Sequence, residues 1–314
     1  MDQRNSPWLA ALLGLALLTA VGGTAGAAPA QSCVLIDTDF DIDDMMAIPM
    51  IIQNRHVAAV VTTEGATTAS LGGSALAHLL GAPGESPPVP VMIGSTPPAD
   101  RGYTPPAWLA AIRTTMERAN GFLPAALPPA PGTKPVEDQV VHAVRNCSRI
   151  TVLVLGPWTS FVRYSPRIAS RIVSVVAQGR PTHSAAEGDN LKTFNCAYDV
   201  PSCEKAFVQT AGMHPVWVDV PKQATPPYSP TIDMVEALHP NGLPGALKAA
   251  LLATQATWRV DLLDEANGKS FLWDQLAALY VLRPGLFHRV AAHMEPAVSA
   301  SDIRRVWTSL TNGH

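Results

Sequence analysis

Short runs of Val, Ile and Leu recur along this chain with helix-like segments between them, and this alternation limits the fold more than any other feature. The runs show little polar alternation, so each is expected to be buried on both faces, as strands of a parallel sheet are. We expect strands at 33–38, 57–62, 89–93, 150–155, 172–177 and 215–218, and helices at 43–54, 70–80, 136–145 and 203–210. The predicted fold class is α/β, with a mostly parallel central sheet, helices on both faces, and ligands at the carboxyl ends of the strands.

The N-terminal segment has the order of a secretory signal peptide. Residues 1–8 are polar, residues 9–21 are almost wholly apolar, and small residues follow up to Ala30. The apolar run is shorter than the roughly 20 residues that span a bilayer. We therefore expect a signal peptide at 1–30, export to the periplasm or the exterior without stable membrane insertion, and a single α/β domain at 31–314. An uncleaved membrane anchor is the alternative.

The four cysteines of an exported chain can form disulfides. We favour Cys196 with Cys203 and Cys33 with Cys147, because Cys33 and Cys147 each precede a strand-like run and could lie at one edge of the sheet. Free buried thiols are the alternative.

The charge pattern argues against nucleic acid as a partner. Charged residues make up 15% of the chain and the net charge is −3, whereas a nucleic-acid surface needs clustered Lys and Arg. The expected partner is a small molecule.

Five carboxylates lie in the eight residues from Asp37 to Asp44, where a buried strand leads into a helix. Close negative charges repel one another, and some would have to be protonated unless a cation joined them. Hard carboxylate oxygens suit Ca²⁺ or Mg²⁺. Asp43 and Asp44 could also cap the helix, but capping explains only part of the cluster.

Other interpretations of this cluster fit less well. An EF-hand loop needs Gly at its sixth position and Glu at its twelfth, and this chain has Ile42 and Ile48 there. A phosphatase with Asp-x-Asp after a strand would not need the further pair Asp43-Asp44. A solvated acidic turn also remains open.

The spacing Asp-x-Asp-x-x-x-Asp-Asp resembles the start of the inosine-uridine nucleoside hydrolase family. The family usually has Pro-Gly where this chain has Phe40-Asp41. Further blocks resemble the family in the same order, at 61–65, 152–159, 193–195 and 273–278. The resemblance covers nearly all of the chain after residue 30. It implies hydrolysis of the N-glycosidic bond of a ribonucleoside, with a purine base expected, by a water bound to Ca²⁺.

The resemblance also implies roles for individual residues. Calcium would be held by the carboxylates of Asp39, Asp44 and Asp274 and by the backbone carbonyl of Leu155. Asp39 would also take the proton of the attacking water. The ribose would be bound by Asp43, Asn195 and Asp274. Asp274 is expected in the first turn of a helix that Ser270 could cap and that runs to about Val281. Relatives are often dimers or tetramers, so a homo-oligomer is possible.

The departures from the family pattern affect the leaving group. Trp273 stands where many members have the His that protonates the departing base, Ala66 replaces an Asn, and Thr193 replaces a Glu. Aromatic stacking of the base could compensate. The candidates are Trp273, Trp158, Trp108, Tyr103 and Tyr228, with His183 as an alternative acid; ordinary packing or solvation is the other reading of each.

The sequence is therefore consistent with two alternative functions. The first is the hydrolase, with Trp273 assigned to the leaving-group side. The second is a catalytically degenerate protein that binds ribose or a nucleoside and keeps the metal site. A metal-dependent phosphatase is a weaker third possibility.

Overall fold

The structure is a computed structural model that describes residues 31–81, 89–100, 103–107, 109–110, 113–114, 116–117, 134–180, 193–258 and 271–314, with the side chains of 254–258 excepted. The predicted signal peptide at 1–30, Trp108 and His183 lie outside the described residues.

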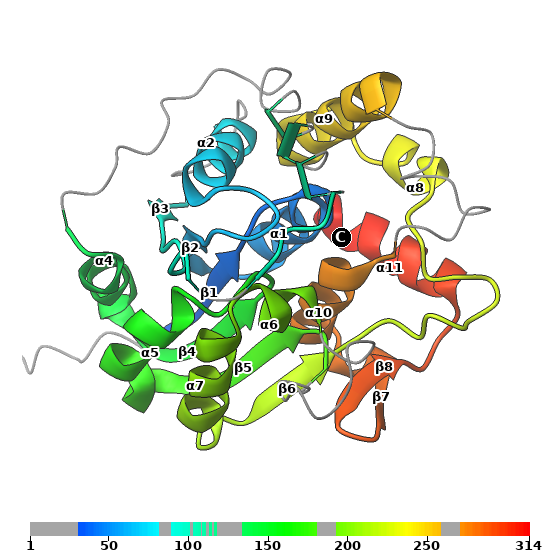
Figure 1. Cartoon of the computed structure of the whole chain (residues 1–314). Coiled ribbons are helices and arrows are strands. Elements are labelled where there is room, and N and C mark those ends of the chain that lie inside the picture. Colours follow the sequence, from blue (N-terminus) through cyan, green and yellow to red (C-terminus); the bar gives the residue numbers. More distant parts are fainter. Residues whose placement is uncertain are drawn as a thin grey trace, which may run out of the picture. The chain divides into compact units, whose positions relative to one another are not determined.

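An eight-stranded sheet forms the centre of the fold, in the order β3-β2-β1-β4-β5-β6-β8-β7 (Figure 1). Only β7 runs antiparallel to its neighbour, so the predicted mostly parallel sheet is confirmed. The strands are β1 (Gln31–Thr38), β2 (Val57–Thr62), β3 (Val91–Ile93), β4 (Cys147–Val154), β5 (Ile172–Gln178), β6 (Pro215–Val218), β7 (Phe287–Val290) and β8 (His293–Pro296).

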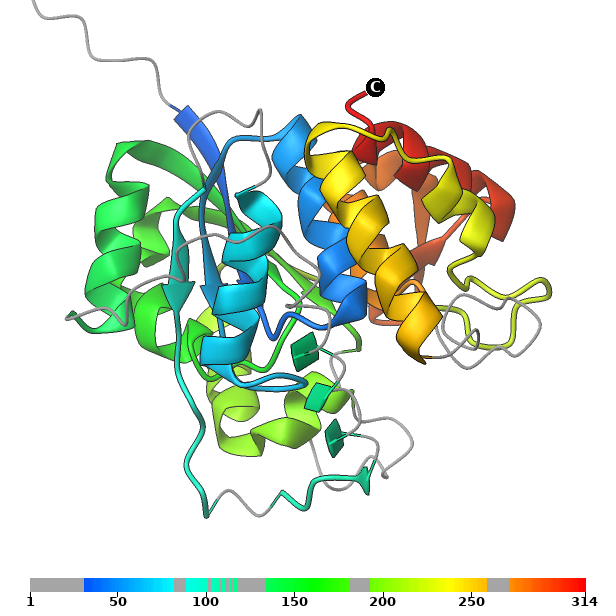
Figure 2. The same ribbon diagram turned by 90° about the horizontal axis from the view of Figure 1, so that it is seen from above.

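Helices cover both faces of the sheet, as predicted (Figure 2). Successive side chains of a strand point to opposite faces, and in β1 Val34 and Ile36 enter one core while Cys33 and Leu35 enter the other. The first face is covered by α1 (Ile42–Asn54), α2 (Ala69–Leu80), α8 (Ile232–Glu236), α9 (Gly242–Trp258), α10 (Trp273–Leu282) and α11 (Ala300–Thr311). The second face is covered by α4 (Val136–Ala143), α5 (Phe161–Ile168) and α7 (Val200–Thr210). The short α6 (Phe194–Tyr198) precedes α7, and three-residue 3₁₀ turns η1 (Val144–Asn146), η2 (Ala169–Arg171) and η7 (Pro284–Leu286) precede β4, β5 and β7.

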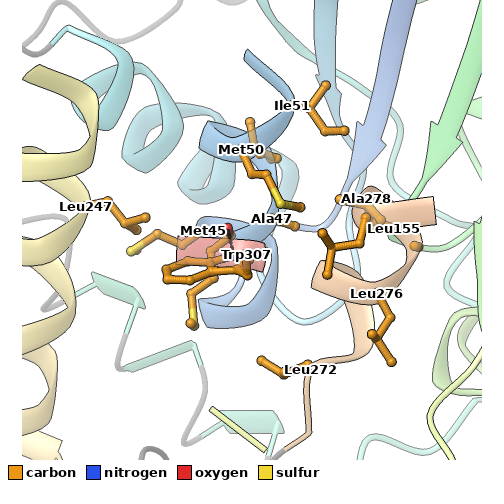
Figure 3. Packing of buried hydrophobic residues seen from close by; sticks show 14 of the residues in the cluster. Met45, Ala47, Met50, Ile51, Leu155, Leu247, Leu272, Leu276, Ala278 and Trp307 are labelled. Atoms are coloured by element: carbon orange, nitrogen blue, oxygen red, sulfur yellow. Dashed lines mark hydrogen bonds between the residues drawn. The ribbon is translucent and has the colours of Figure 1, made fainter. Parts of the chain in front are cut away.

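The core between α1, α10 and α11 fixes the helices that carry the candidate site. Trp307 of α11 is fully buried, and its indole Nε1 donates to the backbone carbonyl of Met46 in α1 at 2.9 Å. Figure 3 shows the Trp307 ring beside Met45, with Leu272 and Leu276 of the α10 region packed nearby. The N-terminal turns of α1 and α10 are therefore held by a rigid apolar core.

Both predicted disulfides are confirmed. Cys33 in β1 pairs with Cys147 in the neighbouring β4, with their Cα atoms 5.8 Å apart. Cys196 in α6 pairs with Cys203 in α7, with 5.2 Å between Cα atoms. Two disulfides are typical of proteins from an oxidising compartment. Within the described part of the chain, no helix has the length and apolar character needed to cross a membrane.

Candidate active site

The candidate site begins where β1 ends, at the carboxyl edge of the sheet. Phe40 has a φ of 43°, so the chain turns through the left-handed region between strand and helix. Asp41 is the N-cap of α1: its Oδ1 accepts from the Asp43 amide, and the Asp44 carboxylate accepts from the Asp41 amide at 3.0 Å. The expectation that Asp43 and Asp44 cap this helix is therefore corrected: Asp41 is the cap and Asp44 completes a capping box.

Two neighbouring segments hold the carboxylates in place. Asp39 Oδ2 accepts a hydrogen bond from the backbone amide of Ala66 at 2.7 Å, and the Thr38 hydroxyl donates to Asp44. A Cβ atom at Gly65 would overlap the Asp39 carboxylate, and one at Gly156 would lie 2.6 Å from the Asp39 amide nitrogen. Glycine is required at both positions because Asp39 approaches each backbone closely.

Asp274 reaches the same cluster from the other end of the chain. It lies in the first turn of α10, which packs against α1. The helix begins at Trp273 with Leu272 in the cap position, and Ser270, the predicted cap, lies outside the described residues. Asp274 is buried, and burial followed by the charges of Asp43 and Asp44 raises its pKa well above the usual value. The helix therefore delivers a further carboxylate to the acidic turn.

Burial and neighbouring negative charges also raise the pKa values of the other carboxylates in the cluster. Burial and then the charge of Asp44 raise the pKa of Asp39, and burial and then the charge of Asp41 raise the pKa of Asp43. Burial raises the pKa of Asp44 to about 7, with the charge of Asp41 as the next cause. Among the described residues, no Lys or Arg forms an ion pair with any of these groups. The cluster therefore lacks a protein counter-ion in the described part of the chain.

The donor set fits a hard divalent cation. Carboxylate oxygens of Asp41, Asp43 and Asp44 lie within 4.8 Å of one another, and Asp39 and Asp274 are coupled to them electrostatically. All of these donors are oxygens, which Ca²⁺ and Mg²⁺ prefer. The crowding of carboxylates predicted from the sequence thus includes Asp41, to which the family resemblance assigns no role.

Asn195 and Leu155 meet beside this cluster. The Asn195 amide donates to the Leu155 carbonyl oxygen at 2.6 Å and to Gln178 Oε1 at 3.3 Å. Leu155 directly follows β4, and its amide donates to the backbone carbonyl of Asp37. A carbonyl oxygen has two lone pairs, so the Leu155 oxygen keeps acceptor capacity beyond Asn195.

The side chain of Asp37 belongs to a separate polar network. Its Oδ1 accepts from the Thr63 hydroxyl at 2.5 Å, and Thr63 also bonds the Ser160 hydroxyl at 2.6 Å. Burial raises the pKa of Asp37 to about 7, although the hydroxyls of Thr63 and Tyr164 lower it. Through Thr63, this network connects Asp37 in β1 with Ser160 at the start of α5.

The predicted aromatic candidates separate into different environments. Trp158 is buried in the core against Phe161 and Trp217, and the Tyr228 hydroxyl donates to the Val298 carbonyl. Both are occupied in packing. Trp273 is partly exposed and contacts the ring of Phe271 at a centroid distance of 5.4 Å.

Tyr103 lies in a small aromatic cluster with α6. Its ring centroid is 4.8 Å from that of Tyr198 and 6.4 Å from that of Phe194. Ala66 belongs to the same cluster. Thr193 caps α6 through its hydroxyl, at 3.4 Å from the Cys196 amide. Of the described stacking candidates, Trp273 lies next to Asp274 in α10, and Tyr103 packs against α6, which carries Asn195.

The fold and the acidic cluster define an α/β protein with a candidate cation site at the carboxyl edge of its sheet. The sequence matches the family described as inosine-uridine preferring nucleoside hydrolase over residues 34–310. The chain belongs to this family.

Individual relatives agree with that assignment. Uridine nucleosidase 1 of Arabidopsis thaliana is 25% identical over 263 residues, which cover 81% of this chain and 75% of the relative. The solved inosine-uridine preferring nucleoside hydrolase of Bacillus anthracis shares the fold, with a TM-score of 0.62, 16% identity, and coverage of 90% of this chain and 100% of the other. The type III effector protein XopQ, solved with adenosine diphosphate ribose, has a TM-score of 0.57, 17% identity, and coverage of 90% and 92%.

Proposed function

We propose that this protein is a Ca²⁺-dependent hydrolase of the N-glycosidic bond of ribonucleosides, with a purine base preferred. The family match and the shared fold support nucleoside hydrolysis as the reaction. The observation that carries the proposal for this chain is the meeting of Asp274 with Asp39 and Asp44, because buried carboxylates without a protein cation ionise together only when a bound cation neutralises them.

The family resemblance implies which residues would hold the cation. Asp39, Asp44 and Asp274 would hold Ca²⁺ through carboxylate oxygens, and Leu155 through its carbonyl. When bound, the cation supplies positive charge that lowers the pKa of a nearby water.

The remaining steps fall to the side chains of the chain itself. Asp39 accepts the proton of the attacking water, since its Oδ2 is already oriented by the Ala66 amide. Asp43, Asn195 and Asp274 bind the ribose hydroxyls. The negative charges of the cluster stabilise the positive charge that develops on the sugar as the base departs.

The leaving-group side relies on aromatic rings. Trp273 borders Asp274 in α10, and Tyr103 packs against α6, which carries Asn195. An indole cannot donate a proton as an imidazolium does. Stacking of the base on these rings would take the place of the His acid, as the resemblance implies for some purine-preferring members of the family, and this is the reason for expecting purines.

Hydrolysis of p-nitrophenyl riboside by the purified protein tests the proposal, since this leaving group needs no protonation. Activity should disappear on chelation, return with Ca²⁺, and be absent in Asp39→Asn. Asp233→Asn is the matched control, because Asp233 is an exposed carboxylate in the first turn of α8. An absence of hydrolysis by the Ca²⁺-loaded wild type would overturn the proposal.

A ribose-binding protein without catalysis is the second candidate. It is favoured by Thr193, whose hydroxyl caps α6 and takes the place of the family's Glu, and by Ala66, which has no polar side chain. Calorimetry with inosine on the Ca²⁺-loaded protein distinguishes the two: heat of binding without release of hypoxanthine supports this candidate, whereas release of the base excludes it. Phosphate release from inosine monophosphate would instead indicate a phosphatase.

A further inference from the structure

Arg113 joins the turn that donates to Asp39 with the helix that carries Asn195. Its guanidinium donates to the carbonyl oxygen of Gly65 at 3.1 Å and to that of Ala66 at 3.4 Å, in the turn that follows β2. The same guanidinium donates to the hydroxyl of Tyr198 in α6 at 3.0 Å. A single side chain thus links the turn to the helix.

Each end of this link leads directly to a site residue. The Ala66 amide, which belongs to the turn held by Arg113, donates to Asp39 Oδ2 at 2.7 Å. Tyr198 lies three residues after Asn195 in α6, and residues three apart share a helix face. The position of Arg113 therefore bears on both Asp39 and Asn195.

Glu64 completes the cluster and balances its charge. The Tyr198 hydroxyl donates to Glu64 Oε1 at 2.8 Å, and the same oxygen lies 3.7 Å from the Arg113 guanidinium. The positive charge of Arg113 is thereby paired locally. Its contribution to the site is geometric, through the bonds it donates, since its charge is matched by Glu64.

We propose that Arg113 is a positioning residue that sets the separation of Asp39 and Asn195, and thereby the fit of the site to Ca²⁺ and ribose. The inference rests on the proposed function of those two residues. α6 has only five residues, and so short a helix is held by tertiary contacts rather than by its own hydrogen bonds. The Cys196–Cys203 disulfide ties α6 to α7, and Arg113 ties it to the turn beside Asp39.

The planar fork of Arg is what this role requires. Three acceptors from two segments surround one guanidinium, and a Lys ammonium on a flexible stem does not reproduce that geometry. Arg113→Lys keeps the charge and removes the fork. Tyr198→Phe leaves the bonds of Arg113 to Gly65 and Ala66 in place and removes those of the Tyr198 hydroxyl to Arg113 and Glu64. Arg305→Lys is the control, because the Arg305 side chain is 76% exposed and pairs only with Asp302 of its own helix among the described residues.

Amide hydrogen exchange of the full chain with Ca²⁺ tests the link without any need for activity. Arg113→Lys should speed exchange in both 63–66 and 193–199. Tyr198→Phe should speed it more in 193–199 than in 63–66, where Arg113 still binds the carbonyl oxygens of Gly65 and Ala66. Arg305→Lys should change neither segment. Unchanged exchange of both segments in Arg113→Lys would overturn the proposal. If Arg113→Lys does not fold, Tyr198→Phe decides: unchanged exchange at 193–199 overturns it.

A measurement of Ca²⁺ affinity distinguishes a positioning role of Arg113 from a role in stability alone. Calorimetry on the folded Arg113→Lys protein should show a Ca²⁺ dissociation constant raised roughly tenfold, the lower end of what supporting residues contribute to metal sites. A lowered thermal midpoint with unchanged Ca²⁺ affinity would overturn the proposal. A wild type that binds no Ca²⁺ would refute the proposed function, while the exchange experiment would still show whether Arg113 links the two segments.

Discussion

The side-chain amide of Asn195 lies 2.6 Å from the backbone carbonyl oxygen of Leu155, so a residue proposed to bind ribose directly contacts one proposed to bind calcium. The contact brings the carboxyl end of β4 together with α6. Changes at Asn195 are therefore expected to affect both functions of the site.

Replacement of Asn195 by Asp should harm the site more than replacement by Ala. A carboxylate would face the Leu155 carbonyl and add a like charge to the acidic cluster, whereas Ala only removes two hydrogen bonds. We expect the KM for p-nitrophenyl riboside to rise roughly tenfold in Asn195→Ala, and kcat/KM to fall further in Asn195→Asp, as expected for supporting groups. Steady-state kinetics at saturating Ca²⁺ measure both; equal effects of the two variants would contradict this account.

Gly65→Ala should displace Asp39 and weaken Ca²⁺ binding, because a Cβ atom there meets the Asp39 carboxylate. We expect a loss of unfolding free energy of about 1–3 kcal/mol from overpacking, together with a higher Ca²⁺ dissociation constant. Gly212→Ala is the matched control, since a Cβ atom at Gly212 meets nothing within 4 Å. Calorimetry and urea unfolding provide the measurements, and an unchanged Ca²⁺ affinity in Gly65→Ala would count against the placement of Asp39.

The metal-free protein should lose stability as the pH rises from about 4 to 7. Asp37 and Asp44 have pKa values of about 7 in the folded protein, against 3.8 as the ordinary value. Between these values the folded state binds more protons than the unfolded state, so the free energy of unfolding falls with rising pH. Urea unfolding in chelator measures the slope, and Asp37→Asn should make it shallower. A slope as steep in Asp37→Asn as in the wild type would show that Asp37 does not contribute.

Trp307→Ala should destabilise the core that positions α1 and α10. The indole is fully buried and its Nε1 bonds the Met46 carbonyl, so we expect a loss of about 3–5 kcal/mol. Val208→Ala, at a residue that is 80% exposed, should change the unfolding free energy by less than about 0.5 kcal/mol. Urea unfolding of both variants checks the contrast.

Loss of the two disulfides should differ in cost. Cys33 and Cys147 are separated by 114 residues and Cys196 and Cys203 by 7. The chain-entropy estimate gives about 5 kcal/mol for the long loop and about 2 kcal/mol for the short one. Paired Cys→Ala variants and urea unfolding measure the difference. We expect the short disulfide to affect KM more, since Cys196 adjoins Asn195; an effect on stability alone would contradict this.

The sheet was largely predictable because buried parallel strands are continuous apolar runs. The predicted bounds of β2 and β6 match the structure, and those of β1, β4 and β5 differ by a few residues. The β7–β8 hairpin was missed because Phe287–Val290 and His293–Pro296 carry His, Arg and Glu at a partly exposed sheet edge. α5, α6, α8, α9 and α11 were also missed, although Ser299 caps α11 through its hydroxyl.

The candidate site was predictable where its residues are close in sequence or belong to a family block. The acidic turn and Asp274 were both foreseen, and the structure brings them together. The capping role of Asp41 was not foreseen, since Asp41, Asp43 and Asp44 are all favourable near a helix N-terminus. Nothing in the sequence around Arg113 indicates its partners, because its contacts with Gly65 and Tyr198 arise only from tertiary folding.

The acidic turn at Asp37–Asp44 is synthesised early, whereas Asp274 lies in α10, close to the C-terminus. A nascent or proteolysed chain that stops short of α10 carries the crowded negative charges without the helix that closes around them. If Asp274 is a Ca²⁺ ligand as proposed, we expect such a fragment to retain Ca²⁺ poorly, so capture of the ion would distinguish finished molecules from incomplete ones.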